Sequence, residues 1–351
     1  MKVSFLIPAR GSVPFYDAVT GLMRVAAPQL DVELELIEGD FESETMIARG
    51  RELAARASRP DYVLLVNYLS VATELIPVFA AAELKTFLVV EGLNDGDRVA
   101  IGRAGRASYL GEIVPDDFEA GRLLAELLVD EARRGGLGAG GEVRVGVLGG
   151  VQSQAASQRF RGWQAFKGSR AGVTQSGFHY GSWTREAGRI AATALLRSAP
   201  GTDVLWCFND DMALGASDAA RALGRTPGKD LLVAGIDMIE PALAAVRDGV
   251  LLASLGGHII DGVRALLALD EHRGAGWASP RVERTRLEAV QAAEAGRHLE
   301  FLQAEAWRDV DYTRFSARRN PGEPREELSL RALVTGPAGR SRRGVRGFVT
   351  P

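Results

Sequence analysis

The sequence predicts an α/β protein built on mostly parallel sheets. Short runs of β-branched and apolar residues alternate with longer amphipathic stretches almost from end to end, which is typical of parallel strands joined by helices. The chain has 351 residues, more than one hydrophobic core usually holds, so two domains are expected. The alternation forms two similar units with a late helix and strand left over, which indicates that the chain crosses between domains more than once.

The first unit is a β-α-β-α-β-α-β segment. In its second strand Val32, Leu34 and Leu36 alternate with Glu33 and Glu35, a pattern that predicts one wetter face and a place near a sheet edge. The expected strands are residues 2–7, 31–37, 61–66 and 85–90, and the expected helices are residues 14–27, 42–57 and 71–82.

A loop rich in Gly, Asp and Arg, residues 92–106, is expected to precede a strand at 109–114 and to mark a domain boundary. The second unit repeats the architecture of the first. Its expected helices are residues 118–134, 156–167, 184–198, 211–223 and 239–248, and its expected strands are residues 142–148, 173–179, 203–208, 230–236 and 250–255. A helix at 259–271, a strand at 282–288 and a helix at 291–305 are expected to follow.

The α/β pattern fails from Asp309 onward. We expect the extension at 311–333 to pack on the second domain. The last residues, from 336, carry four Arg and four Gly without core periodicity, which favours a solvated flexible tail over a segment that binds nucleic acid or anionic lipid. The arginines of this tail are Arg340, Arg342, Arg343 and Arg346.

Composition excludes several classes of protein. With 42 Lys+Arg against 45 Asp+Glu the net charge is -3, so the chain lacks the basic field that drives nucleic-acid binding. The single cysteine, Cys207, forms no intrachain disulfide, and no Cys/His cluster has zinc-ligand spacing. We expect no metal and no cofactor. No apolar run approaches the roughly 20 residues that span a bilayer.

Enzyme motifs are also missing. The segment at 149–153, Gly-Gly-Val-Gln-Ser, lacks the glycine order of a dinucleotide site, and the glycines at 224–228 have the wrong spacing for a phosphate loop. No G-x-S-x-G elbow is present, and the four histidines lie near no Ser or Cys motif. Cys207 lies in an apolar strand, which favours a buried, inert thiol. We therefore expect a protein that is not an enzyme.

Polar side chains instead stand where strands end, and open α/β sheets bind ligands at the carboxyl ends of their strands. Asn209 follows one such strand, and Asp210 or Asp211 is expected at the helix N-cap after it. Asp237 ends the next strand, where it either caps a helix or accepts hydrogen bonds from ligand hydroxyls. Arg159 lies early in the helix that follows the strand at 142–148.

These segments together resemble the type I periplasmic sugar-binding proteins, which include ribose- and galactose-binding proteins and autoinducer-2 receptors. The resemblance covers about residues 1 to 300, and the core is shared with the ligand domain of lactose-repressor-type regulators. It rests on Asn-Asp-Asp-Met-Ala-Leu-Gly-Ala at 209–216, Arg159-x-x-Gly162, Val-Ala-Gly-Ile-Asp at 233–237 and Pro14-Phe15-Tyr16.

The resemblance implies two doubly wound parallel-sheet lobes joined by a hinge of three crossovers. Residues 1–114 plus 259–285 would form the N-terminal lobe, residues 115–258 plus 286–333 the C-terminal lobe, and residues 334–351 a flexible tail.

The same resemblance implies a set of ligand contacts. Phe15 and Tyr16 would supply aromatic contacts from the first lobe, and Trp183 would stack on the sugar ring unless it is a core residue. Sugar rings offer apolar C–H faces and a rim of hydroxyls, which aromatic plates and hydrogen-bonding groups match.

Arg159, Asn209 and Asp237 would hydrogen-bond ligand hydroxyls. Glu91 stands after the fourth strand, where ribose-binding relatives carry Asp-Arg, and we include it among the ligand contacts. His258 stands near the last crossover, where relatives often have Gln, and is expected either to contact the ligand or to act at the hinge.

The function that follows is capture of a small polyhydroxylated ligand by hinge closure, without chemistry, for an ABC permease or a membrane sensor. We expect a periplasmic monomer whose signal peptide has been removed, with no nucleic-acid partner. The alternative is the effector-binding core of a lactose-repressor-type regulator, which requires a helix-turn-helix upstream of the first strand.

Overall fold

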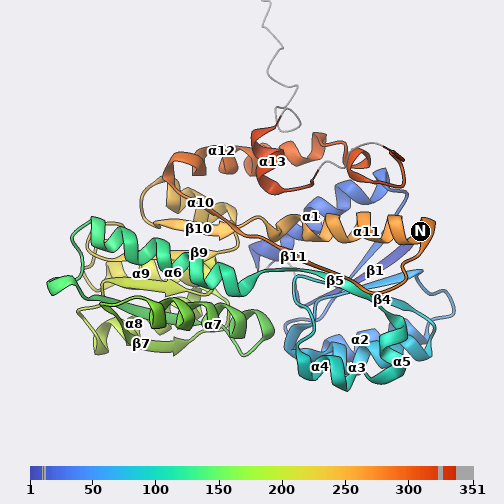
Figure 1. Cartoon of the computed structure of the whole chain (residues 1–351), viewed down its shortest axis with the longest axis horizontal. Coiled ribbons are helices and arrows are strands. Elements are labelled where there is room, and N and C mark those ends of the chain that lie inside the picture. The colour runs from blue at the N-terminus through green and yellow to red at the C-terminus, as the bar shows by residue number, and fades with distance from the viewer. Residues whose placement is uncertain (10, 12, 323–326, 337–351) are drawn as a thin grey trace, which may run out of the picture.

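The computed structural model describes all residues except 10, 12, 323–326 and 337–351. Two six-stranded sheets form two lobes that lie side by side (Figure 1). The first sheet has the order β11-β5-β4-β3-β1-β2, and the second has the order β12-β10-β9-β8-β6-β7. Every pairing between these strands is parallel except that of β12 with β10.

The strands of the first sheet are β1 (Lys2–Ile7), β2 (Glu33–Glu38), β3 (Tyr62–Leu65), β4 (Lys85–Val89), β5 (Tyr109–Pro115) and β11 (Arg281–Thr285). Those of the second are β6 (Val143–Gly149), β7 (Val173–Tyr180), β8 (Val204–Cys207), β9 (Leu232–Ile236), β10 (Ala253–Gly256) and β12 (Glu288–Val290). The predicted α/β class is confirmed, and β2 does lie at a sheet edge.

Helices cover both sheets and close their cores. In the first lobe these are α1 (Pro14–Gln29), α2 (Ser43–Ala55), α3 (Ala72–Ala81), α4 (Asp95–Ala100), α5 (Gly102–Ser108) and α11 (Asp261–Ala275). In the second they are α6 (Asp117–Arg134), α7 (Gln154–Ser169), α8 (Arg185–Ser198), α9 (Asp210–Ala222), α10 (Glu240–Arg247) and α12 (Ala292–Gln303). The central strands are buried on both faces, Cys207 with them, because helices lie above and below each sheet.

The chain passes between the sheets three times. It leaves the first sheet after β5, returns between β10 and β11, and leaves again between β11 and β12. The expected repeated crossing is therefore observed. The single strand expected at 282–288 is wrong, because β11 and β12 are separate strands in different sheets.

The loop expected at 92–106 is also wrong in part, since it contains α4 and α5. A capping box starts α4: the Asn94 side chain accepts a hydrogen bond from the Asp97 backbone N–H, and the Asp97 carboxylate accepts one from the Asn94 backbone N–H. The Gly and Asp residues that suggested a loop belong to helix ends.

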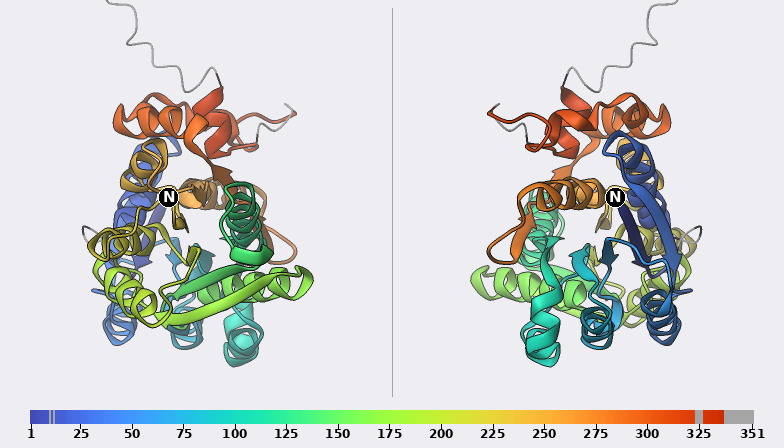
Figure 2. Two further views of the ribbon diagram at one scale, coloured as in Figure 1. Left: turned by 90° about the vertical axis from the view of Figure 1, so that its left-hand side faces the viewer. Right: turned by 90° about the vertical axis from the view of Figure 1, so that its right-hand side faces the viewer.

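The segment from α12 to α13 forms a layer over both lobes, which we call the C-terminal layer; it lies along the top of Figure 1, and Figure 2 shows it from each side. It contains α12, two 3₁₀ turns, η4 (Ala306–Asp309) and η5 (Tyr312–Phe315), and α13 (Leu330–Thr335). The expectation that residues 311–333 pack on the second domain is incomplete, because Tyr312 and Ser316 hydrogen-bond to the first lobe.

The predicted flexible tail began at 334, but Val334 and Thr335 belong to α13. Its four arginines lie outside the described residues. Within the part of the chain that the structure describes, none of the helices is long and apolar enough to cross a membrane.

Candidate ligand-binding site

A cavity of about 80 Å³ lies between the lobes, with room for several water molecules or one small ring. Both lobes contribute its walls from strand ends and helix starts. All the side chains implied by the resemblance line it: Phe15, Tyr16, Glu91, Arg159, Trp183, Asn209, Asp237 and His258. We refer to it as the inner cavity.

The Arg159 guanidinium is held in place by the second lobe. It is 4% exposed, its Nε donates to Asp117 Oδ1 at 2.8 Å, and its Nη1 donates to the backbone carbonyl of Phe208. Its Cζ also lies 5.7 Å from the centroid of the Trp183 ring, which is cation–π range. Sequence reasoning missed Asp117, which follows β5 at a strand end, as the other site residues do. Because Nη2 hydrogen-bonds to no described residue, Arg159 keeps donors for a ligand.

Asn209 is the N-cap of α9, so the expected cap at Asp210 or Asp211 is wrong. Its Oδ1 accepts from the Met212 backbone N–H at 3.0 Å, and its Nδ2 donates to the carbonyl of Trp183 at 2.9 Å. Asn209 therefore positions the tryptophan loop as well as the helix. Asp210 instead is fully buried and accepts from Ser254 Oγ at 2.7 Å.

Asp237 and His258 lie next to each other in the wall of the cavity. Burial raises the pKa of Asp237 to about 7, against the lowering effect of Arg159. Burial, with Arg159 beside it, lowers the pKa of His258 to about 4. The 3.5 Å approach of His258 Nε2 to Asp237 Oδ1 is therefore a contact of a neutral imidazole, although its distance falls within ion-pair range.

His258 also has an unused hydrogen-bonding atom. Its ring is 1% exposed, and Nδ1 is buried with no hydrogen-bond partner among the described residues. A buried polar atom without a partner destabilises a protein unless water or a ligand pairs with it. Since His258 lines the inner cavity, a ligand hydroxyl placed there would supply the missing partner.

Glu91 makes contacts that join the two lobes. It follows β4 of the first lobe, and its Oε1 accepts from the backbone N–H groups of Gln154 at 2.7 Å and Ala155 at 3.3 Å, in the first turn of α7. The side chain is 8% exposed, and this burial raises its pKa to about 7, while the hydrogen bonds from α7 act in the opposite direction. Glu91 thus closes the cleft as well as lining it.

Aromatic rings form the apolar wall of the inner cavity. The Phe15 ring centroid lies 5.3 Å from that of Tyr16 and 4.7 Å from that of His258. Burial, with Glu91 and Asp237 nearby, raises the pKa of Tyr16 well above its usual value, so its hydroxyl stays a donor. Sequence reasoning missed Phe41 and Tyr68, an edge-to-face pair that follows the carboxyl ends of β2 and β3.

Strained backbone gathers around this cavity. Val90, Trp183 and Asp237 line it with φ values of 70°, 64° and 140°, and Met238 beside them has φ 57°. Positive φ is unfavourable for residues with a side chain and most of all for a β-branched one. Such strain persists where the surrounding structure fixes it, which is typical of functional sites.

The charges around the cavity favour a neutral ligand. Among the described residues that line it, Arg159 is the one cation and Asp117 already pairs with it, while Glu91 and Asp237 add acidic groups. Among the described residues, no group of three or more His, Cys, Asp or Glu side chains is placed to hold a metal ion.

Two lobes that close over a buried, hydrogen-bonding cavity define a solute-binding protein. The chain belongs to the periplasmic binding protein domain family, whose model matches residues 3–259. The family and the relatives below are binding proteins, and this chain is a binding protein and not an enzyme.

Individual relatives agree with this assignment. The chain is 33% identical over 141 residues to the D-ribose/D-allose-binding protein of Pseudomonas aeruginosa, and the matched region covers 40% of this chain and 41% of that protein. It is 24% identical over 245 residues to the galactofuranose-binding protein of Escherichia coli, and the matched region covers 68% of this chain and 71% of that protein. A solved periplasmic sugar-binding protein from Pseudomonas fluorescens superimposes with a TM-score of 0.85 at 30% identity, and covers 95% of this chain and 99% of that one.

Proposed function

We propose that this protein captures a neutral sugar in the inner cavity by closure of the two lobes. The observation that carries the proposal is the cavity itself, which combines aromatic rings with the polar side chains of Arg159, Asp237 and His258. Such a surface matches the apolar face and the hydroxyl rim of a sugar ring. The ribose, allose and galactofuranose named for the relatives are ligands of this chemistry.

We propose further that the protein acts as a periplasmic monomer that delivers its sugar to an ABC permease or presents it to a membrane sensor. One solved neighbour is described as the periplasmic binding protein component of an arabinose ABC transporter. It is 21% identical to this chain, so it shares the fold, and that shared fold supports a permease as the partner. We propose lobe boundaries at 114/115, 258/259 and 285/286; the sheet membership of β10, β11 and β12 supports the last two, whereas Pro115, the last residue of β5, still pairs in the first sheet. The net charge of -3 gives no support to a nucleic-acid partner, and the relatives favour this function over a transcription regulator.

The test is a thermal-shift and calorimetric screen of D-ribose, D-allose, D-galactose and L-arabinose. A true ligand raises the unfolding midpoint by mass action. Asp237→Ala should weaken its binding about 100-fold, because a carboxyl group that accepts ligand hydroxyls contributes about 2–3 kcal/mol. Asp218→Ala, which removes a carboxylate of an exposed ion pair with Arg185, is the matched control and should bind as wild type.

Galactose 6-phosphate serves as a charged probe and should not bind, because Arg159, the one cation among the described lining residues, is already paired with Asp117. If no sugar shifts the melt, or if Asp237→Ala binds as tightly as wild type, the proposed function or its site is wrong.

A further inference from the structure

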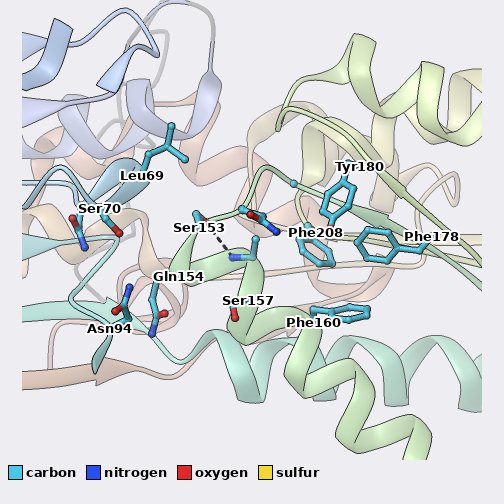
Figure 3. Close-up of a pocket in the computed structure, with 14 residues that line it drawn as sticks. Leu69, Ser70, Asn94, Ser153, Gln154, Ser157, Phe160, Phe178, Tyr180 and Phe208 are labelled. Atoms are coloured by element: carbon cyan, nitrogen blue, oxygen red, sulfur yellow. Dashed lines mark hydrogen bonds between the residues drawn. The ribbon is translucent and has the colours of Figure 1, made fainter. Parts of the chain in front are cut away.

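A second and larger pocket adjoins the inner cavity. It has a volume of about 630 Å³, and both lobes line it (Figure 3). We call it the outer pocket. Ser153 lines both spaces, and chain neighbours line them at two further places: Tyr68 and Leu69 on the first lobe, and Asn209 and Phe208 on the second. The partition between the two spaces is therefore a single layer of residues.

The partition comes from both lobes. A Cβ added to Gly150, which lines the outer pocket, would lie 2.3 Å from the Trp183 indole, so this indole rests directly on the Gly150 backbone. Ser153 and Trp183 belong to the second lobe and Tyr68 to the first. Because both lobes contribute to the partition, it is complete only when the lobes are closed.

One wall of the outer pocket is aromatic. Phe178 lies at the centre, with its ring centroid 5.1 Å from Phe160, 4.6 Å from Tyr180 and 6.4 Å from Phe208. Tyr180 is 63% exposed, an unusual state for a large ring at the end of a strand. Figure 3 shows these rings on one side of the pocket.

The remaining polar lining is uncharged and comes from both lobes. Figure 3 shows Ser70 and Asn94 of the first lobe facing Gln154 and the aromatic side. Among the described residues, the side chains of Ser70, Gln152, Gln154 and Ser157 hydrogen-bond to no other group, and no lining residue carries a charge. Free amides and hydroxyls around an aromatic platform are a surface for a neutral, hydroxyl-rich ring, whereas phosphates and carboxylates would find no cation among the described residues.

We infer that the outer pocket is a second carbohydrate subsite, and that the ligand is a disaccharide or longer glycoside whose first ring occupies the inner cavity. This inference rests on the proposed function of the inner cavity. The second ring packs on Phe178 and Tyr180 and hydrogen-bonds to Gln152, Gln154 and Ser157.

Calorimetry with pairs of neutral probes tests the inference: D-galactose against lactose and melibiose, and L-arabinose against α-1,5-arabinobiose. At least one disaccharide should bind about tenfold more tightly than its monosaccharide, the gain expected of an added aromatic contact and hydrogen bond. Tyr180→Ala, at an exposed position, should weaken the disaccharide about tenfold and change monosaccharide affinity less than twofold. Ser157→Trp fills the outer pocket and should abolish only disaccharide binding.

The outcomes are distinct. If a monosaccharide binds and no disaccharide binds more tightly than its monosaccharide, the subsite is wrong while the proposed function stands. Equal losses for both probe classes in Tyr180→Ala and Ser157→Trp also overturn it. If neither class binds to the wild-type protein, the proposed function fails, and the inference fails with it.

Discussion

Among the acidic side chains of the inner cavity, Glu91 hydrogen-bonds across the cleft to the first turn of α7. A helix N-terminus favours a negative charge, yet burial outweighs that effect and raises the pKa of Glu91 to about 7. The carboxyl group therefore takes up a proton in the closed, folded protein at a pH where an unfolded glutamate is ionised. Asp237, with its pKa also raised, acts in the same direction, and His258, with its pKa lowered, acts in the opposite direction.

Replacement of Glu91 isolates its contribution. Between pH 4.5 and pH 7 the folded wild type binds more protons at this position than the unfolded chain does, so its stability falls as the pH rises. Glu91→Gln keeps a hydrogen-bond acceptor and cannot ionise. Relative to wild type, the variant should gain up to about 3 kcal/mol over this range. Urea unfolding at several pH values measures the difference, and Glu33→Gln on the exposed edge strand is the control substitution. Parallel curves for Glu91→Gln and wild type would contradict this role.

At the scale of elements, the C-terminal layer fastens the two lobes at one side of the molecule. Asp270 of α11 accepts hydrogen bonds from Ser316 at 2.8 Å and from Arg318 at 2.7 Å, and Gln29 of α1 bonds to the backbone of Val310 and Tyr312. On the other lobe, α12 packs against α10, and Gln303 donates to Glu240 at 2.9 Å. The layer is thus attached on both sides of the crossings.

Asp270 should carry much of this attachment. Its side chain is fully buried, so Asp270→Ala leaves the buried Ser316 hydroxyl and the Arg318 guanidinium without their acceptor. The expected loss in the free energy of unfolding is about 2–3 kcal/mol. Asp31, which pairs with Arg319 but has a 73% exposed side chain, supplies the control, and Asp31→Asn, which suits the positive φ of 54° at this position, should cost less than about 0.5 kcal/mol. Chemical denaturation compares the two, and equal small losses would show that the layer is only loosely attached.

At the scale of the whole molecule, the rule that ligands bind at the carboxyl ends of parallel strands explains what was predictable. From the sequence alone, this rule indicated Asn209 and Asp237 as candidate ligand contacts, and the resemblance then added residues near other strands. The same rule, applied to β2, β3 and β5, would also have indicated Phe41, Tyr68 and Asp117. These were missed because single aromatic and acidic residues after strands are common and carry no motif.

Other features have no local signal. The sequence at 282–288 is typical of one strand, because it contains no turn residue at Arg286 and Leu287, where the chain passes from one sheet to the other. The interlobe position of Glu91 and the attachment of the C-terminal layer depend on tertiary contacts between distant segments. The outer pocket is of this kind as well, because its lining combines residues of both lobes that are distant in sequence.

Closure itself is testable, because the inner cavity and the Glu91 contact both require it. A ligand that touches both lobes binds the closed state more tightly and shifts the population toward it. Small-angle scattering should show a lower radius of gyration when a bound sugar saturates the protein, and no change for Asp237→Ala at the same sugar concentration.

Glu91→Ala removes one interlobe contact, so the ligand-free variant should be more open than wild type. Its sugar affinity should fall about threefold to tenfold, since apparent affinity scales with the fraction of binding-competent protein. A ligand-free wild type as compact as its complex would show that the lobes stay closed and that sugar enters by another route.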